Sequence, residues 1–219
     1  VNRHGSIFYV SPVAAISNSL QYAAITMLIS LIAGTLLAFA FVKRPAAKRW
    51  LDLLVMLPFG ASAVTLGLGF IVAFSNSPLA RTSFPWLVPL AHSLIAMPFV
   101  LRAVQPALAS IPDSLRQSAA VLGATPLRVW WQVEMKLISR SLLMGGLFAF
   151  TISLGEFGAT SFIARADNPT MPVAIFRYLS QPGALNYGQA LAMATILIVI
   201  CALSISLLES LSRAFNGTD

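Results

Sequence analysis

Residues Ala23–Val42 read AAITMLISLIAGTLLAFAFV, a run of twenty residues without a charged side chain. A helix of about 20 apolar residues is long enough to cross the hydrocarbon core of a bilayer. Four further stretches share this character. The membrane-crossing helices are therefore expected near residues 14–42, 53–74, 86–107, 142–164 and 188–211. The sequence predicts an all-α membrane protein with about five transmembrane helices.

The composition of the whole chain supports a lipid environment. Of its 219 residues, 58% are hydrophobic and 10% are charged, whereas soluble domains carry about 25% charged residues. A soluble domain of this size has too little interior to bury so much apolar surface. The net charge of +7 raises the question of nucleic-acid binding. Because the basic residues lie in short clusters between apolar runs, the charge is typical of membrane-flanking loops, and we expect no nucleic-acid partner.

Lysine and arginine are divided unevenly between the two sides of the predicted bundle. One side receives ten of them: Lys43, Arg44, Lys48, Arg49, Arg102, Arg116, Arg128, Lys136, Arg140 and Arg213. The other side receives four: Arg3, Arg81, Arg165 and Arg177. Cytoplasmic loops carry an excess of basic residues. We therefore predict a cytoplasmic membrane protein with the N-terminus of this segment outside and its C-terminus in the cytoplasm.

The start of the chain bears on its domain organisation. The first residue is Val1, and no signal-peptide pattern precedes the first apolar run. An external N-terminus without such a signal indicates one further helix upstream, for six in all. We expect residues 1–219 to form one transmembrane domain that belongs to a longer polypeptide.

The segment 110–140, SIPDSLRQSAAVLGATPLRVWWQVEMKLISR, is long for a loop between transmembrane helices. Ser110, followed by a proline and an aspartate, predicts the capped start of a helix. Gly123 predicts the end of that helix, and Thr125 before Pro126 predicts a second start. The segment is therefore expected to be a hairpin of two short helices.

Two interpretations of this hairpin are open from the pattern alone. Small residues around the turn would let a partner approach the backbone closely: Ser118, Ala119, Ala120, Gly123 and Ala124. Alternatively, the hairpin is amphipathic and lies on the membrane face, with Trp130 and Trp131 as interfacial anchors.

The hairpin resembles the signature cytoplasmic loop of ABC importer permeases. That loop begins Glu-Ala-Ala and has a glycine four residues after the second alanine. The corresponding positions here are Gln117, Ser118, Ala119 and Gly123, and Ala124 also matches a habitual family neighbour. In the family, this loop is the coupling helix that docks into an ATPase subunit. The resemblance implies that these five residues couple the chain to an ATPase.

This chain departs from the family loop at two positions. Gln117 replaces the family's glutamate, and Lys136 replaces its later proline. The preceding Ile111–Pro112 agrees with the family pattern. The loop is thus a degenerate version of the signature.

A second resemblance lies downstream. Ser153–Thr160, SLGEFGAT, resembles a Leu-Gly-Glu-Phe-Gly stretch in permeases for oxyanions, ferric iron and thiamine. Pro172–Phe176 and Gly188–Ala192 are similar to thiamine and ferric-iron permeases in particular. The resemblance extends from Ser17 to Glu209. It implies a type I importer fold and one half of a fused two-half permease. The implied partners are a homologous permease half, two ATPases and an extracytoplasmic solute-binding protein. Thiamine or ferric iron is the favoured substrate, with oxyanions or polyamines as alternatives.

Glu156 is the acidic residue within an expected span. A charged residue at the bilayer centre costs about 2.5–3.5 kcal/mol on insertion scales, so it needs an inward face, a partner or a proton. Two roles stay open: Glu156 lines the translocation path or outer gate, or Gly155 and Gly158 let a neighbouring helix satisfy it. His92 beside Ser93 is expected to make a polar contact between helices, because adjacent helical residues do not face each other.

Enzymatic chemistry is not expected. The sequence holds no Gly-rich loop followed by lysine and serine or threonine, no paired catalytic constellation and no metal-ligand pattern. We therefore expect no cofactor in this chain and ATP hydrolysis by a separate chain. The alternatives are an ion-coupled secondary transporter, a membrane enzyme and a passive assembly subunit.

Overall fold

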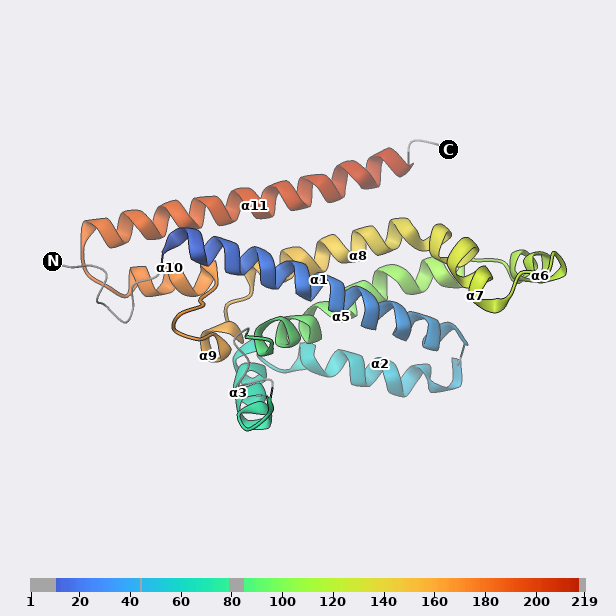
Figure 1. Cartoon of the computed structure of the whole chain (residues 1–219), viewed down its shortest axis with the longest axis horizontal. Helices are drawn as coiled ribbons and strands as arrows, with labels where there is room; N and C mark the ends of the chain where they lie inside the picture. Colours follow the sequence, from blue (N-terminus) through green and yellow to red (C-terminus); the bar gives the residue numbers. More distant parts are fainter. Residues whose placement is uncertain (1–10, 44, 79–84, 217–219) are drawn as a thin grey trace.

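The computed structural model describes residues 11–43, 45–78 and 85–216, and the regular structure within these ranges is helical (Figure 1). The elements are α1 (Pro12–Lys43), α2 (Pro45–Gly60), α3 (Ala63–Phe74), α5 (Leu87–Ala109), α6 (Asp113–Val121), α7 (Pro126–Val129), the π-helical turn η2 (Trp130–Glu134), α8 (Met135–Gly155), α9 (Thr160–Ile163), α10 (Met171–Leu179) and α11 (Ala184–Asn216).

Within the described residues, four helical runs are long and apolar enough to cross a membrane. They are α1, α5, the continuous run from Pro126 to Gly155, and α11 as far as Ser210. A bent helix pair, Asp52–Pro58 with Ala63–Phe74, would be a fifth span. The prediction of an all-α membrane protein with about five spans is confirmed. Helices α1 and α11 cover the ranges expected near 14–42 and 188–211 and extend past both ends, and α5 runs from Leu87 to Ala109 where 86–107 was expected.

The second expected span, residues 53–74, is broken rather than straight. Its two parts meet at 98°. Pro58 has no amide hydrogen to give to the preceding turn. Ser62 then starts a new helix, because its backbone is extended and its hydroxyl accepts the N–H of Thr65 at 3.1 Å. The sequence prediction of a single helix missed this cap.

The fourth expected span, residues 142–164, is displaced toward the N-terminus. Helices α7 and α8 form one run through η2 that starts at Pro126 and ends at Gly155. Residues 126–140, predicted as the second arm of a loop hairpin, are therefore the foot of a membrane helix. The chain beyond Gly155 is extended at Glu156 and forms only the single turn α9.

The centre of the bundle is the contact of α5 with α1 and α8. Val100 of α5 is fully buried. A Cβ placed on Gly34 of α1 would lie 2.8 Å from the Cβ of Val100, and one on Gly145 of α8 would lie 3.1 Å from its Cα. Missing side chains on both neighbours thus let three backbones approach closely, as small residues do in membrane helix packing.

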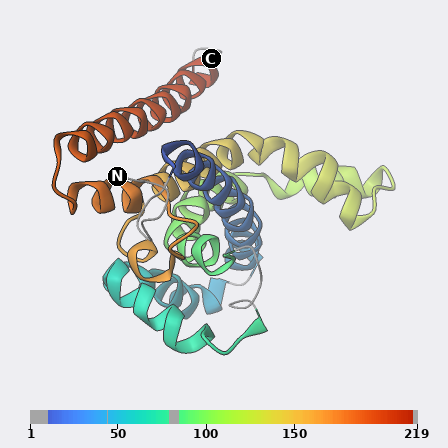
Figure 2. The same cartoon turned by 60° about the vertical axis from the view of Figure 1, so that its left-hand side comes forward.

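The periphery is less buried. Helix α11 lies along one edge of the bundle and α2–α3 along another (Figures 1 and 2). Many apolar side chains of α11 are exposed, among them Leu191, Ile198, Leu203 and Ile205. Short helix α10 packs between α11 and α1.

The two ends of the bundle carry different elements. The last residues of α1, α5 and α11 lie toward the end from which α6 and α7 project, and α9 and α10 lie toward the other (Figure 1). Lys43 and Arg128 are at the first end, and Arg165 and Arg177 are at the second. This division matches the grouping used to predict orientation. Arg3, Arg44 and Arg81 lie outside the described residues.

Candidate functional site

The hairpin of α6 and α7 turns at Gly123, which has a φ of +81°. The N–H of Ala124 donates to the carbonyl of Ala119 at 3.0 Å, and the N–H of Gly123 donates to Ala120 at 2.9 Å. This pair of bonds is a Schellman motif, which closes a helix with a left-handed residue. Glycine adopts that conformation without steric cost. The predicted helix end at Gly123 is confirmed.

The start of α7 also follows the prediction. Thr125 is extended, and its hydroxyl accepts the N–H of Arg128 at 3.4 Å, while Pro126 takes the first helical position. The predicted cap at Ser110 is wrong. Ser110 closes α5 instead, since its hydroxyl donates to the carbonyl of Ala107 at 2.8 Å. The extended residue before α6 is Pro112.

The tip of the hairpin exposes apolar side chains. Within α6 (Asp113–Val121), no residue is buried. Val121 is 86% exposed, Leu122 87% and Leu127 73%. The hairpin projects from the bundle in both views (Figures 1 and 2). Clustered exposed apolar side chains mark interaction surfaces, and the tip is therefore a candidate docking surface.

The five residues that the motif singles out lie together on this hairpin. Gln117, Ser118 and Ala119 are in α6, and Gly123 and Ala124 form the turn that ends it. Gln117, Ser118 and Gly123 are exposed, and Ala119 and Ala124 are partly buried. The structure thus brings the set onto one capped helix end beside the apolar tip.

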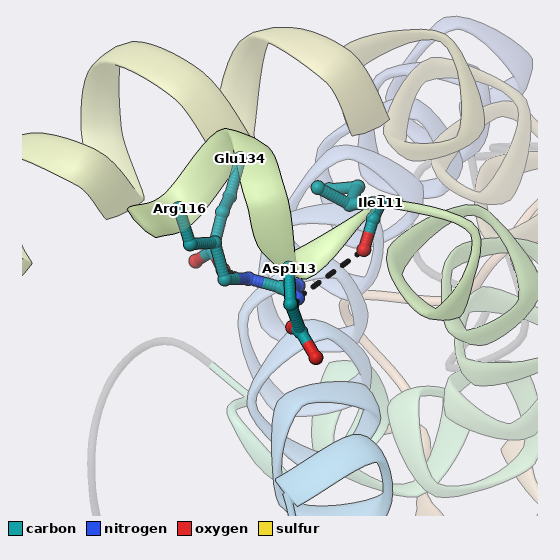
Figure 3. Close-up of polar contacts among 4 residues, drawn as sticks. All are labelled: Ile111, Asp113, Arg116 and Glu134. Atoms are coloured by element: carbon teal, nitrogen blue, oxygen red, sulfur yellow. Dashed lines mark hydrogen bonds and ion pairs between the residues drawn. The ribbon is translucent and has the colours of Figure 1, made fainter. Parts of the chain in front are cut away.

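An ionic cluster fastens α6 to the foot of the next membrane helix (Figure 3). The Nε of Arg116 donates to Oε1 of Glu134 at 2.7 Å. Its Nη1 donates to Oδ1 of Asp113 at 2.7 Å and to the carbonyl of Ile111 at 3.2 Å. The Glu134 side chain is only 7% exposed, and Asp113 is 83% exposed. The hydrogen bond to Glu134 raises the pKa of Arg116 above its ordinary value.

Sequence reasoning did not single out Arg116 or Glu134 as a pair. They are 18 positions apart, and Glu134 lies in η2, a π-helical turn that the residue pattern gave no sign of. The available signal was an arginine and a glutamate on opposite arms of a predicted hairpin. That signal is weak, because most such pairs are solvated.

Two open cavities adjoin this cluster. One has a volume of about 680 Å³ and the other about 310 Å³. Lys43, Arg116 and Glu134 line both. Trp130 also lines the larger cavity, and the centroid of its ring lies 6.1 Å from that of Phe39 in α1. The π-helical turn therefore contacts α6 through an ion pair and α1 through aromatic rings.

His92 lies in the bundle interior and makes the polar contact between helices that was expected. Its Nδ1 is 2.8 Å from Oγ of Ser153, and its Nε2 is 2.6 Å from Oγ1 of Thr160. Ser153 in turn donates to Thr26 at 3.2 Å. The Thr160 hydroxyl also donates to the carbonyl of Glu156 at 3.1 Å. The network ties α1, α5, α8 and α9 together.

Glu156 is in the link between α8 and α9 and not inside a membrane helix, which corrects the prediction. Its backbone is extended, with a ψ of 117°, and its Oε1 accepts the N–H of Ala159 at 2.6 Å. The side chain thus satisfies a backbone donor of its own chain. Nearby, Gly158 allows close packing on α3, since a Cβ there would lie 2.7 Å from that of Ala63.

Changing Glu156 separates its two proposed roles. The amide oxygen of Glu156→Gln can still accept the N–H of Ala159, whereas Glu156→Ala leaves that donor without its partner. If the role is structural, Glu156→Ala lowers the free energy of unfolding by about 1–3 kcal/mol, and Glu156→Gln leaves it near the wild-type value. The check is the midpoint of thermal unfolding in detergent, measured beside uptake. Equal loss of uptake in both variants at unchanged stability would instead support a charge in the translocation path.

Within residues 11–43, 45–78 and 85–216, no three His, Cys, Asp or Glu side chains gather where they could hold a metal ion.

A bundle of apolar helices with a capped hairpin projecting from one end is the architecture of a membrane permease subunit. Residues 11–217 match the family model described as "Binding-protein-dependent transport system inner membrane component". The chain therefore belongs to this family, the type I ABC importer permeases, as the hairpin motif indicated.

Curated relatives include permeases of several transport systems. The chain is 32% identical over 166 residues to a putative 2-aminoethylphosphonate transport system permease protein, PhnV, of Salmonella typhimurium. That alignment covers 76% of this chain and 60% of the relative, so the chain spans about three fifths of PhnV. It is 28% identical to the molybdenum transport system permease protein ModB of Haemophilus influenzae, over 89% of this chain and 91% of that one. It is also 28% identical to the sulfate transport system permease protein CysT of Salmonella typhimurium, over 93% and 78%.

Solved structures share the fold at low sequence identity. The methionine ABC transporter MetNI in an inward-facing conformation matches with a TM-score of 0.63 and 17% identity, over 94% of this chain and 99% of that one. An amino acid ABC transporter crystallised with histidines matches with a TM-score of 0.61 and 15% identity, over 93% of each chain. These likenesses support the permease fold and carry no information on the substrate.

Proposed function

We propose that this chain is the permease component of an ATP-driven, binding-protein-dependent importer in the cytoplasmic membrane, and that the α6–α7 hairpin docks on an ATPase subunit. The exposed tip carries the proposal. Val121, Leu122 and Leu127 present apolar side chains on a projecting hairpin whose turn is fixed by backbone bonds at Gly123 and Ala124 and by the hydroxyl of Thr125. A partner that covers them gains the free energy of apolar burial.

The residues of the motif have separate tasks in this proposal. Ser118 and Ala119 have small side chains that let a partner approach the backbone of α6, Gln117 offers an exposed amide beside them, and Gly123 with Ala124 sets the direction of the turn. The second arm of the hairpin continues without a break into α8. Movement of the ATPase would therefore reach the membrane bundle through a continuous helix.

The same proposal sets the orientation and the partners. The hairpin end of the bundle faces the cytoplasm, in keeping with the excess of basic residues there, and the C-terminus of this segment lies on the same side. ATP hydrolysis comes from two separate ATPase chains. A homologous permease half completes the pathway, and a solute-binding protein delivers the solute from outside. The exposed apolar side of α11 faces lipid or the second half.

The relatives favour an oxyanion or phosphonate substrate. Motif resemblance alone favoured thiamine or ferric iron. The relatives described above are named for 2-aminoethylphosphonate, molybdenum and sulfate instead, which supports the oxyanion alternative. We propose a small anionic solute.

The test is an affinity purification of the full-length, tagged protein from native membranes, with its partners identified by mass spectrometry. We expect an ATPase and a solute-binding protein to be recovered. Uptake into vesicles made from the same membranes should require ATP and should favour 2-aminoethylphosphonate, sulfate or molybdate over thiamine and ferric iron. Recovery without an ATPase, together with uptake driven by an ion gradient, would favour a secondary transporter.

A further inference from the structure

We propose that Arg116 and Glu134 form a latch, an ion pair with a buried carboxylate that fixes α6 to the foot of α8 and is required for ATPase movement at the hairpin to move the membrane helices. Both are positioning residues in this role. The latch rests on the proposed function of the hairpin and deepens it, because it names the contact through which the hairpin acts.

Helix α6 has little else to hold its direction. It is nine residues long and without a buried residue of its own, and isolated helices of that length are not stable in water. The cavities of about 680 and 310 Å³ beside it show that packed side chains do not support it there. Apart from its chain connections, α6 is therefore held chiefly by the contacts of Arg116.

The guanidinium of Arg116 joins three segments of chain (Figure 3). It bonds the carbonyl of Ile111 after α5, the carboxylate of Asp113 in the first turn of α6, and the carboxylate of Glu134 in η2. Arginine suits such a junction because its donors are fixed in one plane. A rotation of α6 would break at least one of these bonds unless the foot of α8 moved with it.

The contact with Glu134 is the strong one of the two ion pairs. Glu134 is almost wholly buried, whereas Asp113 is mostly exposed. Exposed pairs contribute little, but a buried carboxylate deprived of its cation is heavily penalised. The pair therefore resists separation, which a rigid connection needs.

The π-helical turn connects the latch to two membrane helices, α8 and α1. Glu134 is the last residue of η2, directly before α8, and π-helical turns occur frequently at functional sites. Trp130, the first residue of the same turn, lies against Phe39 of α1. A displacement of η2 would thus move α8 through the chain connection and α1 through the ring contact.

The test compares Arg116→Gln, Glu134→Gln and the double variant in the complete complex, purified with its ATPase and reconstituted in proteoliposomes. The probe is whichever of 2-aminoethylphosphonate, sulfate and molybdate the wild type accumulates with ATP. The measured quantity is the amount of probe transported per ATP hydrolysed. We expect each single change to lower it about tenfold, with ATPase recovery and basal hydrolysis unchanged, because the tip is intact.

The double variant and two further changes sharpen the result. The double variant has no charge at either position. Its loss of transport per ATP should therefore be no larger than that of the more impaired single variant. Arg116→Lys should recover part of the activity, since an ammonium can reach Glu134 but lacks the planar fork. Arg102→Gln is the matched control. It removes an exposed ion pair of 3.1 Å with Asp52 of α2, and we expect wild-type transport per ATP.

Three outcomes overturn the latch. Additive losses in the double variant would mean that the two residues act independently. Parallel loss of transport and ATP hydrolysis, or loss of the ATPase from the complex, would mean that the pair only maintains the docking surface. A wild-type complex without an ATPase would refute the proposed function itself, and the latch would fall with it.

Discussion

Replacement of Gly123 by valine is expected to abolish transport while the protein still inserts into the membrane. Gly123 has a φ of +81°, a conformation that costs an L-residue about 1–2 kcal/mol and a β-branched one more. No other described group lies within 4 Å of the position of its Cβ, so the effect comes from backbone strain and not from a clash. Valine would open the Schellman turn and misdirect the tip of the hairpin.

A graded series tests this cause. Gly123→Asn should keep much more uptake than Gly123→Val, because asparagine tolerates the left-handed conformation best among non-glycine residues. Gly123→Ala should fall between them. Gly188→Val is the matched control, since Gly188 lies within α11, also with open space at its Cβ position. Membrane insertion is followed by protease protection, and uptake by ATP-dependent accumulation. Equal uptake in the asparagine and valine variants would show that the turn does not set the coupling.

The parts of the hairpin that the sequence predicted are those set by local chemistry. Gly123 and the Thr125–Pro126 start satisfy backbone groups within a few residues, so their residue types alone indicate the geometry. Ser110 carries the same type of side chain but bonds backward to Ala107. The sequence cannot distinguish these directions, because a serine at a helix boundary can belong to either helix.

Membrane spans were predicted best at their apolar centres and worst at their ends. The hydropathy of a stretch of residues detects the part of a helix that lies in lipid. It misses the more polar turns, from Pro126 onward, that precede α8 in the same continuous helical run. It also carried the expected span across Glu156, where Gly155 and Gly158 mark the break. The latch could not be predicted from the sequence, because Arg116 and Glu134 meet only through tertiary folding and a π-helical turn.

Movement of the hairpin matters only if the bundle transmits it, and the bundle depends on close backbone contacts. The foot of α8 leads to Gly145, which faces Val100 of α5, and Val100 faces Gly34 of α1 on its other side. The two glycines have no side chains that could absorb a displacement at these contacts. Motion of α8 should therefore reach α5 and α1 directly.

Insertion of one methyl group at Gly34 is expected to destabilise the whole bundle. The Cβ of Gly34→Ala would lie 2.8 Å from Cβ and Cγ1 of Val100 and 3.2 Å from the backbone nitrogen of Leu101. Because a backbone atom is involved, a change of rotamer cannot relieve the overlap. Overpacking costs about 1–3 kcal/mol, against about 1 kcal/mol gained from replacing a helical glycine. Gly34→Val should be worse and should lower the yield of folded protein.

The measurement is the midpoint of thermal unfolding in detergent, followed by tryptophan fluorescence. Gly69→Ala is the matched control, because Gly69 of α3 has no other described group within 4 Å of its Cβ position; the same substitution should there leave the midpoint unchanged or raise it. In the double variant Gly34→Ala with Val100→Gly, the Cβ and Cγ1 atoms that overlap the new methyl group are removed, so the combined loss should be smaller than the sum of the single losses. If Gly34→Ala raised the midpoint as Gly69→Ala does, α1 and α5 would stand farther apart than the structure places them, and direct transmission between them would lose its basis.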